Sequence, residues 1–269
     1  MAQTLFITGA STGIGKATAL HFRKQGWNVA ATLRNPAADT ELADAGVHTF
    51  ALDVTDTATI QPALDGALKA FGRIDALVNN AGYGTFGPFE AATDDQIERQ
   101  YATNVTGLML VTRAFLPHFR ANGAGVIVNI SSVGGVATFP FYSLYHGTKW
   151  AIEGFSESLN FELNGLGIRV KLVEPGAIAT DFGGRSLDVL KKEGLDAYDA
   201  LLNKFMETWA AGRVRSTPEL VAEVIWQAAT DGSNQLRYIA GDDAKMIIEA
   251  RGKATQAEYY AMIRQRLGV

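Results

Sequence analysis

TGASTGIG, residues 8–15, lies between a short apolar run at residues 4–10 and a segment of helical periodicity at about residues 14–25. Glycines between a strand and a helix allow a tight turn and let a phosphate approach the N–H groups of the first helical turn. The stretch therefore predicts a strand–turn–helix unit that binds the pyrophosphate of a dinucleotide. A purely structural turn is the alternative.

A loop that binds nucleoside triphosphates is a second alternative, because Lys16 follows Gly15. That loop requires Gly-x-x-x-x-Gly-Lys followed by Ser or Thr. Counted from Gly9, Ile14 stands where the second glycine is required, and Ala17 follows Lys16. The pattern therefore favours a dinucleotide over a nucleoside triphosphate.

The rest of the chain alternates between apolar runs of strand length and longer helical segments. The predicted strands are 4–10, 28–33, 47–53, 74–80, 125–131, 168–174 and 237–240, and the predicted helices are about 14–25, 57–71, 93–120, 143–164 and 217–230. Most of the strands are apolar throughout, which is typical of a parallel sheet covered on both faces. We expect an α/β fold, a doubly wound Rossmann-type sandwich with a mostly parallel sheet of seven strands in a single domain, residues 1–269.

Two local features refine this prediction. Thr93, followed three residues later by Gln96, forms a capping-box pattern that marks the start of the third helix. Residues 183–212 interrupt the alternation after the sixth strand, at the sheet edge where ligands bind in open α/β folds. This segment is a candidate substrate lid, and a plain surface excursion is the alternative.

The end of the second predicted strand indicates which dinucleotide binds. An acidic residue there would hydrogen-bond the ribose 2′-hydroxyl of NAD, but this position holds the apolar Leu33, and Arg34 follows it. A guanidinium can bind a 2′-phosphate with two parallel hydrogen bonds. We therefore expect NADP(H), unless Arg34 is only a solvated surface residue.

Tyr145 and Lys149 are four residues apart at the start of a predicted helix and therefore share one face of it. A nearby cation favours the phenolate, so we expect Lys149 to lower the pKa of Tyr145 toward working pH. The pair alone is weak evidence, because helices contain this spacing by chance. Asn129-Ile130-Ser131-Ser132 and Asn79-Asn80-Ala81-Gly82, however, end two predicted strands at the ligand edge of the sheet.

These motifs together resemble the short-chain dehydrogenase/reductase family. The matches are TGASTGIG at 8–15, LDVTD at 52–56, NNAG at 79–82, NISS at 129–132, YHGTK at 145–149 and EPG at 174–176. They follow the family's order and spacing over about residues 4–181. ATLRN and YHGTKWAIEGFSESL resemble the hydroxysteroid and retinol dehydrogenase-like branch, which does not define a substrate.

The resemblance implies a role for each matching position. Tyr145 would be the catalytic acid/base, Lys149 would lower its pKa and bind the nicotinamide ribose, Ser132 would hold the substrate oxygen, and Asn104 would support a proton relay. The cofactor positions would be Gly9, Ser11, Thr12, Ile14, Gly15, Arg34, Asp53, Val54, Asn80, Ala81, Gly82, Tyr145, Lys149, Pro175, Gly176, Ile178 and Thr180. The implied reaction is reduction of a carbonyl to an alcohol by hydride transfer.

The substrate side is apolar. Candidate pocket residues on predicted loops at the ligand edge are Phe86, Phe139, Phe141, Tyr142, Phe182 and Leu187. They suggest a bulky hydrophobic ketone or aldehyde, and lid or core packing explains them equally well. His146 is expected on another helix face and therefore in a structural role.

Composition excludes other classes. The chain has 269 residues, 47% hydrophobic, a net charge of −4, no cysteine and four scattered histidines. We therefore expect no catalytic metal, no nucleic-acid or membrane partner, and a soluble cytoplasmic protein without a targeting segment. The resemblance implies a homotetramer or homodimer assembled through helices 93–120 and 143–164. Two other functions stay open: an alcohol or hydroxysteroid dehydrogenase acting oxidatively, and a nucleotide-sensing protein without turnover.

Overall fold

The computed structural model describes residues 2–38, 40–179, 186–210 and 215–268. Its main sheet has seven strands in the order β3-β2-β1-β4-β6-β7-β9, and every pairing in it is parallel. These strands are β1 (Thr4–Ile7), β2 (Asn28–Leu33), β3 (His48–Ala51), β4 (Ala76–Asn79), β6 (Gly125–Ile130), β7 (Ile168–Pro175) and β9 (Arg237–Ala240). The predicted doubly wound sheet is confirmed.

The described residues form helices that cover both faces of this sheet and helices that lie beyond its end. They are α1 (Gly13–Lys24), α2 (Thr40–Asp44), α3 (Ile60–Phe71), α4 (Asp94–Tyr101), α5 (Leu108–Asn122), α6 (Ser143–Asn164), α7 (Asp199–Ala210), α8 (Pro218–Thr230), α9 (Asp242–Lys253) and α10 (Gln256–Leu267). Phe22 of α1 and Ile225 of α8 belong to the core on one face, whereas Leu64 of α3, Phe115 of α5 and Leu159 of α6 belong to the core on the other. Burial on both faces explains why the strands are apolar throughout.

The predicted third helix begins as expected but is not uniform. Thr93 caps it through a complete capping box with Gln96. Between α4 and α5 the backbone forms a π-helical segment, Ala102–Gly107. Such segments recur at functional sites because they shift the side chains that follow. Here the segment contains Asn104, one of the predicted site residues.

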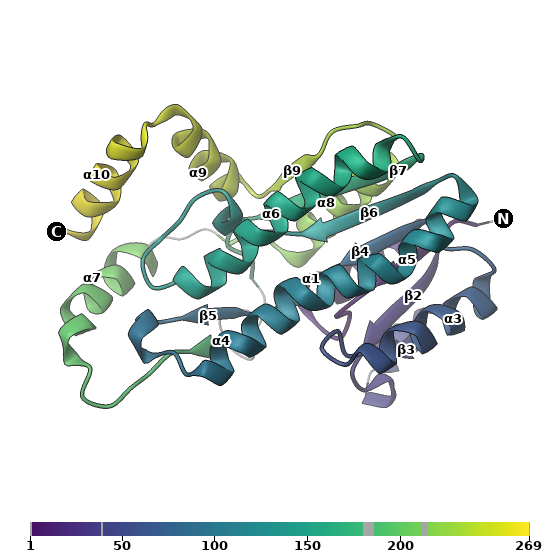
Figure 1. The fold of residues 1–269 in the computed structure, drawn as a ribbon, viewed down its shortest axis with the longest axis horizontal. Coiled ribbons are helices and arrows are strands. Elements are labelled where there is room, and N and C mark those ends of the chain that lie inside the picture. Colours follow the sequence, from purple (N-terminus) through teal and green to yellow (C-terminus); the bar gives the residue numbers. More distant parts are fainter. Residues whose placement is uncertain (1, 39, 180–185, 211–214, 269) are drawn as a thin grey trace.

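One region differs from the prediction. A second, two-stranded parallel sheet pairs β5 (Gly84–Phe86) with β8 (Leu187–Val189). Three-residue strands far apart in the sequence carry too little periodicity to be predicted. The chain beyond β9 forms α9 and α10, and α10 packs against α7. Figure 1 shows α7 and α10 beyond the end of the main sheet where β5 lies.

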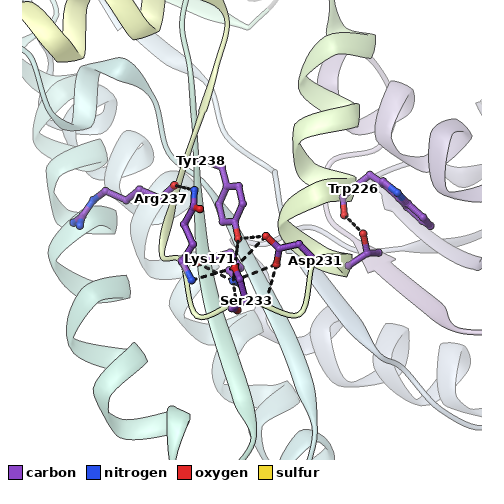
Figure 2. A network of polar contacts seen from close by, with 8 residues as sticks. Lys171, Trp226, Asp231, Ser233, Arg237 and Tyr238 are labelled. Atoms are coloured by element: carbon purple, nitrogen blue, oxygen red, sulfur yellow. Dashed lines mark hydrogen bonds and ion pairs between the residues drawn. The ribbon is translucent and has the colours of Figure 1, made fainter.

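The connection from α8 to β9 is held by a buried lysine (Figure 2). Lys171 of β7 is 1% exposed, and its Nζ donates to the carbonyl oxygens of Ser233 at 2.7 Å and Gln235 at 2.8 Å. It also donates to the hydroxyl of Tyr238 at 3.1 Å, and the carboxylate of Asp231 lies 3.8 Å away. This network fixes the loop that places the edge strand β9.

In the part of the chain that the structure describes, no helix is long and apolar enough to cross a membrane. Within the same residues, no three His, Cys, Asp or Glu side chains are grouped so that they could hold a metal ion.

Candidate active site

One cavity of about 810 Å³ opens at the carboxyl ends of the central strands. It brings together most of the residues predicted from sequence: Gly9, Ser11, Thr12, Ile14, Gly15, Arg34, Asp53, Val54, Asn80, Ala81, Gly82, Ser132, Tyr145, Lys149, Pro175, Gly176 and Ile178. Asn104 and Phe86 lie outside its wall. Thr180 and Phe182 lie outside the described residues, as do parts of the predicted lid.

The glycine-rich turn lies in close contact with the segment that follows β4. Gly9 has a φ of 69°, and a Cβ there would lie 2.8 Å from the Cα of Ala81. The amide of Asn80 donates to the carbonyl oxygens of Thr8 at 3.0 Å and Gly9 at 2.9 Å, which ties the end of β4 to the turn. Thr12 precedes α1 without a side-chain capping bond. The first N–H groups of α1 are therefore not bonded by their capping side chain and can receive an anion.

Arg34 follows β2 at the rim of the cavity, close to Asp53. Burial raises the pKa of the Asp53 carboxyl, but hydrogen bonds from Thr55 and the charge of Arg34 outweigh this effect and leave the pKa below its usual value. The Asp53 carboxylate accepts from the Thr55 N–H at 2.9 Å and from its hydroxyl at 2.7 Å. Arg34 itself is exposed.

Tyr145 and Lys149 lie on one face of α6, as predicted, with Nζ of Lys149 5.7 Å from the centre of the Tyr145 ring. The ammonium donates to the carbonyl oxygen of Ile130 at 2.8 Å. Burial raises the pKa of Tyr145 to about 12, although a hydrogen bond with Ser132 acts in the opposite direction. Burial also lowers the pKa of Lys149 to about 8, while the charge of Glu153 raises it.

The pKa of Tyr145 therefore departs from the expectation, which counted the cation but not the burial. A phenol that leaves water pays a desolvation penalty on its charged form. Burial is the largest cause of the shift, and a phenol with a pKa of about 12 is protonated near neutral pH.

Asn104 is 1% exposed, and its side chain links Tyr83 to Thr148 of α6 by hydrogen bonds. Its amide nitrogen donates to the carbonyl oxygen of Tyr83 at 2.9 Å and to the hydroxyl of Thr148 at 3.1 Å, and its oxygen accepts from the N–H of Tyr83 at 3.1 Å. Both amide hydrogens are thus committed to positioning the chain after β4 against α6. Its predicted role in a proton relay stays a prediction.

The residues predicted to form a substrate pocket divide between the cavity wall and a neighbouring packed cluster. Phe139, Tyr142 and Leu187 line the cavity. Phe86 and Phe141 instead join an adjoining aromatic cluster around Phe205 of α7, with ring centres 5.9 and 5.7 Å from the Phe205 ring. This cluster also contains Leu267 of α10.

The structure adds residues to this wall that the sequence did not indicate: Tyr83, Arg99, Thr103, His146, Ser186, Asp188 and Arg215. Asp188 reaches the wall through the pairing of β8 with β5, and it forms an ion pair with Arg99. No local signal in the sequence predicts this contact. His146 was expected on another helix face, and yet it lines the same cavity as Tyr145.

Comparison with known proteins identifies the family. The family model described as short chain dehydrogenase matches residues 3–188. The chain belongs to the short chain dehydrogenase family. An uncharacterized oxidoreductase of Schizosaccharomyces pombe is 42% identical to it over 219 residues, which cover 81% of this chain and 92% of that protein.

Solved structures of short chain dehydrogenases show the same fold. One from Streptomyces avermitilis has a TM-score of 0.85 at 32% identity, covering 99% of this chain and 98% of that one. The 3-ketoacyl-(acyl-carrier-protein) reductase of Brucella melitensis, complexed with NADH, has a TM-score of 0.74 at 27% identity, covering 90% and 98%. ElxO, with NADP bound, has a TM-score of 0.73 at 27% identity, covering 89% and 98%.

Proposed function

We propose that this oxidoreductase reduces a ketone or aldehyde to an alcohol with NADPH, using Tyr145 as the proton donor. The observation that carries the proposal is the shared cavity, in which the hydroxyls of Ser132 and Tyr145 and the ammonium of Lys149 meet the glycine-rich turn. This shared cavity supports the proposal that a dinucleotide and a small molecule bind next to each other.

The residues fit a nicotinamide dinucleotide. The cavity extends from Arg34 and Asp53 past the amino end of α1 to Tyr145, which suits an elongated ligand with a pyrophosphate in its middle. The absence of a side chain at Gly9 lets the glycine-rich turn lie close against Ala81, which keeps the turn low at the cavity wall. When bound, the cofactor supplies the hydride, and this chain orients it and excludes water.

A protonated Tyr145 fits the reductive direction. As hydride reaches a carbonyl carbon, negative charge develops on the oxygen, and hydrogen bonds from Ser132 and Tyr145 stabilise that charge. The pKa of about 12 keeps the phenol protonated beforehand, so it can donate its proton to the alcohol oxygen. Lys149 would bind the nicotinamide ribose, and its charge would stabilise the phenolate left on Tyr145.

Arg34 supports NADPH over NADH, because its guanidinium lines the cavity and no acidic residue follows β2 at this position. Solved relatives with NADP and with NADH both exist, so binding must be measured. Titrating the protein with each cofactor by fluorescence should give at least tenfold tighter binding of NADPH, or ~1.4 kcal/mol.

Two variants sharpen this test. Arg34→Gln should weaken NADPH about tenfold and leave NADH unchanged, since only the 2′-phosphate contact is lost. Arg120→Gln, an exposed arginine of α5 away from the cavity, is the matched control. Equal binding of both cofactors by the unaltered protein would refute the NADPH preference. Binding of neither would refute the enzymatic function itself.

The oxidative reaction is the second candidate, because the same residues catalyse both directions. Burial of Tyr145 speaks against it, since oxidation needs the phenolate as base. A nucleotide-sensing protein without turnover is a third candidate, but Ser132, Tyr145 and Lys149 are all in place.

We also propose that the lid predicted at residues 183–212 closes over the substrate through α7, whose Phe205 packs on the aromatic cluster beside Tyr142.

Assembly into a homodimer or homotetramer through α5 and α6 is also proposed. These helices form an apolar groove of about 400 Å³, lined by Thr106, Met109, Leu110, Thr112, Arg113, Leu116, Phe155 and Leu159. Such an apolar surface suits a second copy of the same helices packed across a two-fold axis.

A further inference from the structure

His146 is held rigidly in the wall of the cavity. The residue is 4% exposed. Its ring stacks on Tyr142, with ring centres 5.7 Å apart, and meets the ring of Phe139 at 5.5 Å in an edge-on arrangement. Phe139 and Tyr142 also line the cavity. The imidazole is therefore held in one orientation among the side chains that line the cavity.

The backbone determines which ring nitrogen carries the proton. The N–H of Phe139 donates to Nδ1 of His146 at 3.3 Å. A nitrogen that accepts a hydrogen bond carries no proton, so the neutral ring is protonated at Nε2. Burial lowers the pKa of His146 to about 4, which keeps the ring neutral over the working pH range. Nε2 is thus a fixed hydrogen-bond donor.

Gly134 shows where this donor lies relative to the catalytic hydroxyl. A Cβ on Gly134 would lie 3.0 Å from Nε2 of His146 and 3.4 Å from Oγ of Ser132. Gly134 also lines the cavity. The same Cβ would lie 2.7 Å from Cδ2 of His146, so the absence of a side chain at Gly134 is what lets the imidazole lie this close to the backbone, near Oγ of Ser132. Among the described residues, the hydrogen bond of the imidazole is the one at Nδ1, so Nε2–H can serve an occupant of the cavity.

We propose that His146 is a substrate-binding residue that donates a hydrogen bond from Nε2 to a second oxygen of the substrate. Resting on the proposed function, this assignment leaves the reacting carbonyl oxygen to Ser132 and Tyr145. The matching substrate class is a carbonyl compound with a second, neutral oxygen acceptor on a neighbouring carbon, such as a 1,2-diketone or an α-keto ester. A neutral donor suits a neutral acceptor, whereas a carboxylate gains more from a cation.

Two substrates of similar size test this proposal: 1-phenyl-1,2-propanedione, which has the second oxygen, and propiophenone, which lacks it. His146→Phe keeps a ring but removes the donor, and His146→Gln keeps an amide donor near the position of Nε2. With NADPH, His146→Phe should lower kcat/KM for the diketone about tenfold and change that for propiophenone less than twofold. His146→Gln should restore most of the loss.

For each substrate, kcat/KM of a variant is divided by that of the unaltered protein. The higher intrinsic reactivity of the diketone then cancels out of the comparison. An equal loss on both substrates would mean that His146 acts through Tyr145 or through packing, and would overturn the proposal. No loss on either would overturn it as well. Thermal melting of each variant shows whether the fold is retained.

A binding measurement separates this proposal from the proposed function. In Tyr145→Phe with NADPH, ¹⁵N-histidine NMR should show His146 protonated at Nε2, with a resonance that shifts on adding the diketone but not propiophenone. His146→Phe assigns the signal among the four histidines. Protonation at Nδ1, or no shift with the diketone, overturns the proposal. A shift without turnover in the unaltered protein would instead refute the reductase function and keep the binding role.

Discussion

At the scale of single residues, burial decides the chemistry of this cavity more than charge does. Tyr145 and Lys149 are one helical turn apart, and both are largely withdrawn from water. The result is a phenol with a raised pKa and an ammonium with a lowered one. Both shifts follow from the cost of burying a charged form. These shifts agree with the proposed role of Tyr145 as a proton donor.

Replacing Tyr145 by Phe tests the donor directly. Tyr145→Phe removes one hydroxyl from a packed ring, so we expect turnover to fall at least a thousandfold, roughly the size of a general-acid contribution. The Kd for NADPH should change little. Tyr260→Phe, which alters a half-exposed phenol of α10 outside the cavity wall, is the matched control and should retain most activity. Near-normal rates for Tyr145→Phe would contradict the assignment.

The pH dependence of reduction should reflect Lys149. Its pKa of about 8 means that the ammonium is charged below that pH and loses its proton as the pH rises through it. Tyr145, at about 12, stays protonated throughout. We therefore expect kcat/KM for reduction to be level up to about pH 8 and to decline above it. A profile that stays level well beyond that pH, measured by NADPH oxidation, would show that Lys149 is not involved.

At the scale of elements, the carboxyl ends of the strands form the cavity, whereas a buried hydrogen-bond network that stabilises the fold lies at the opposite end of the sheet. The glycine-rich turn after β1, Asn80 after β4 and Ser132 after β6 all face the cavity. Lys171 and its partners lie where α8 leads into β9, and none of them lines the cavity. The two ends of the sheet can therefore be altered independently.

Lys171→Met should destabilise the fold without affecting the cavity. It removes the buried cation that binds the carbonyl oxygens of Ser233 and Gln235 and the hydroxyl of Tyr238. Breaking a buried polar network by removing one partner costs about 3–5 kcal/mol, which urea denaturation would measure. Lys69→Met, at an exposed position of α3, is the control. An unchanged free energy of unfolding would contradict the role of the network.

At the scale of the whole molecule, the chain after β7 completes the cavity wall and the aromatic cluster beside it. The hydroxyl of Tyr259 in α10 donates to the carbonyl oxygen of Thr138 at 2.8 Å, beside the segment that carries Phe139 and Tyr142. Arg266 donates to the carbonyl oxygen of Thr208 in α7 at 3.1 Å. Through these two hydrogen bonds α10 contacts both the loop of the cavity wall and α7; Figure 1 shows α10 and α7 at the same end of the molecule.

Assembly should depend on the groove between α5 and α6. Met109→Glu places a charge in this groove, and burying that charge against a second copy costs several kcal/mol. We expect the variant to elute as a monomer in size-exclusion chromatography with light scattering. Met246→Glu, on the 70% exposed Met246 of α9, is the control. A monomeric unaltered protein, or an oligomeric Met109→Glu, would refute assembly through this face.

The amino-acid sequence by itself determined the sheet, the glycine-rich turn and the spacing of Tyr145 and Lys149, because these depend on local pattern. Apolar runs, a capping box and one helical turn are encoded within a few residues. The tertiary structure alone decided the pairing of β5 with β8, the place of Asp188 in the cavity wall, the protonation of His146 and the raised pKa of Tyr145. Each of these depends on burial or on contacts between segments distant in the chain, for which the sequence has no local signal.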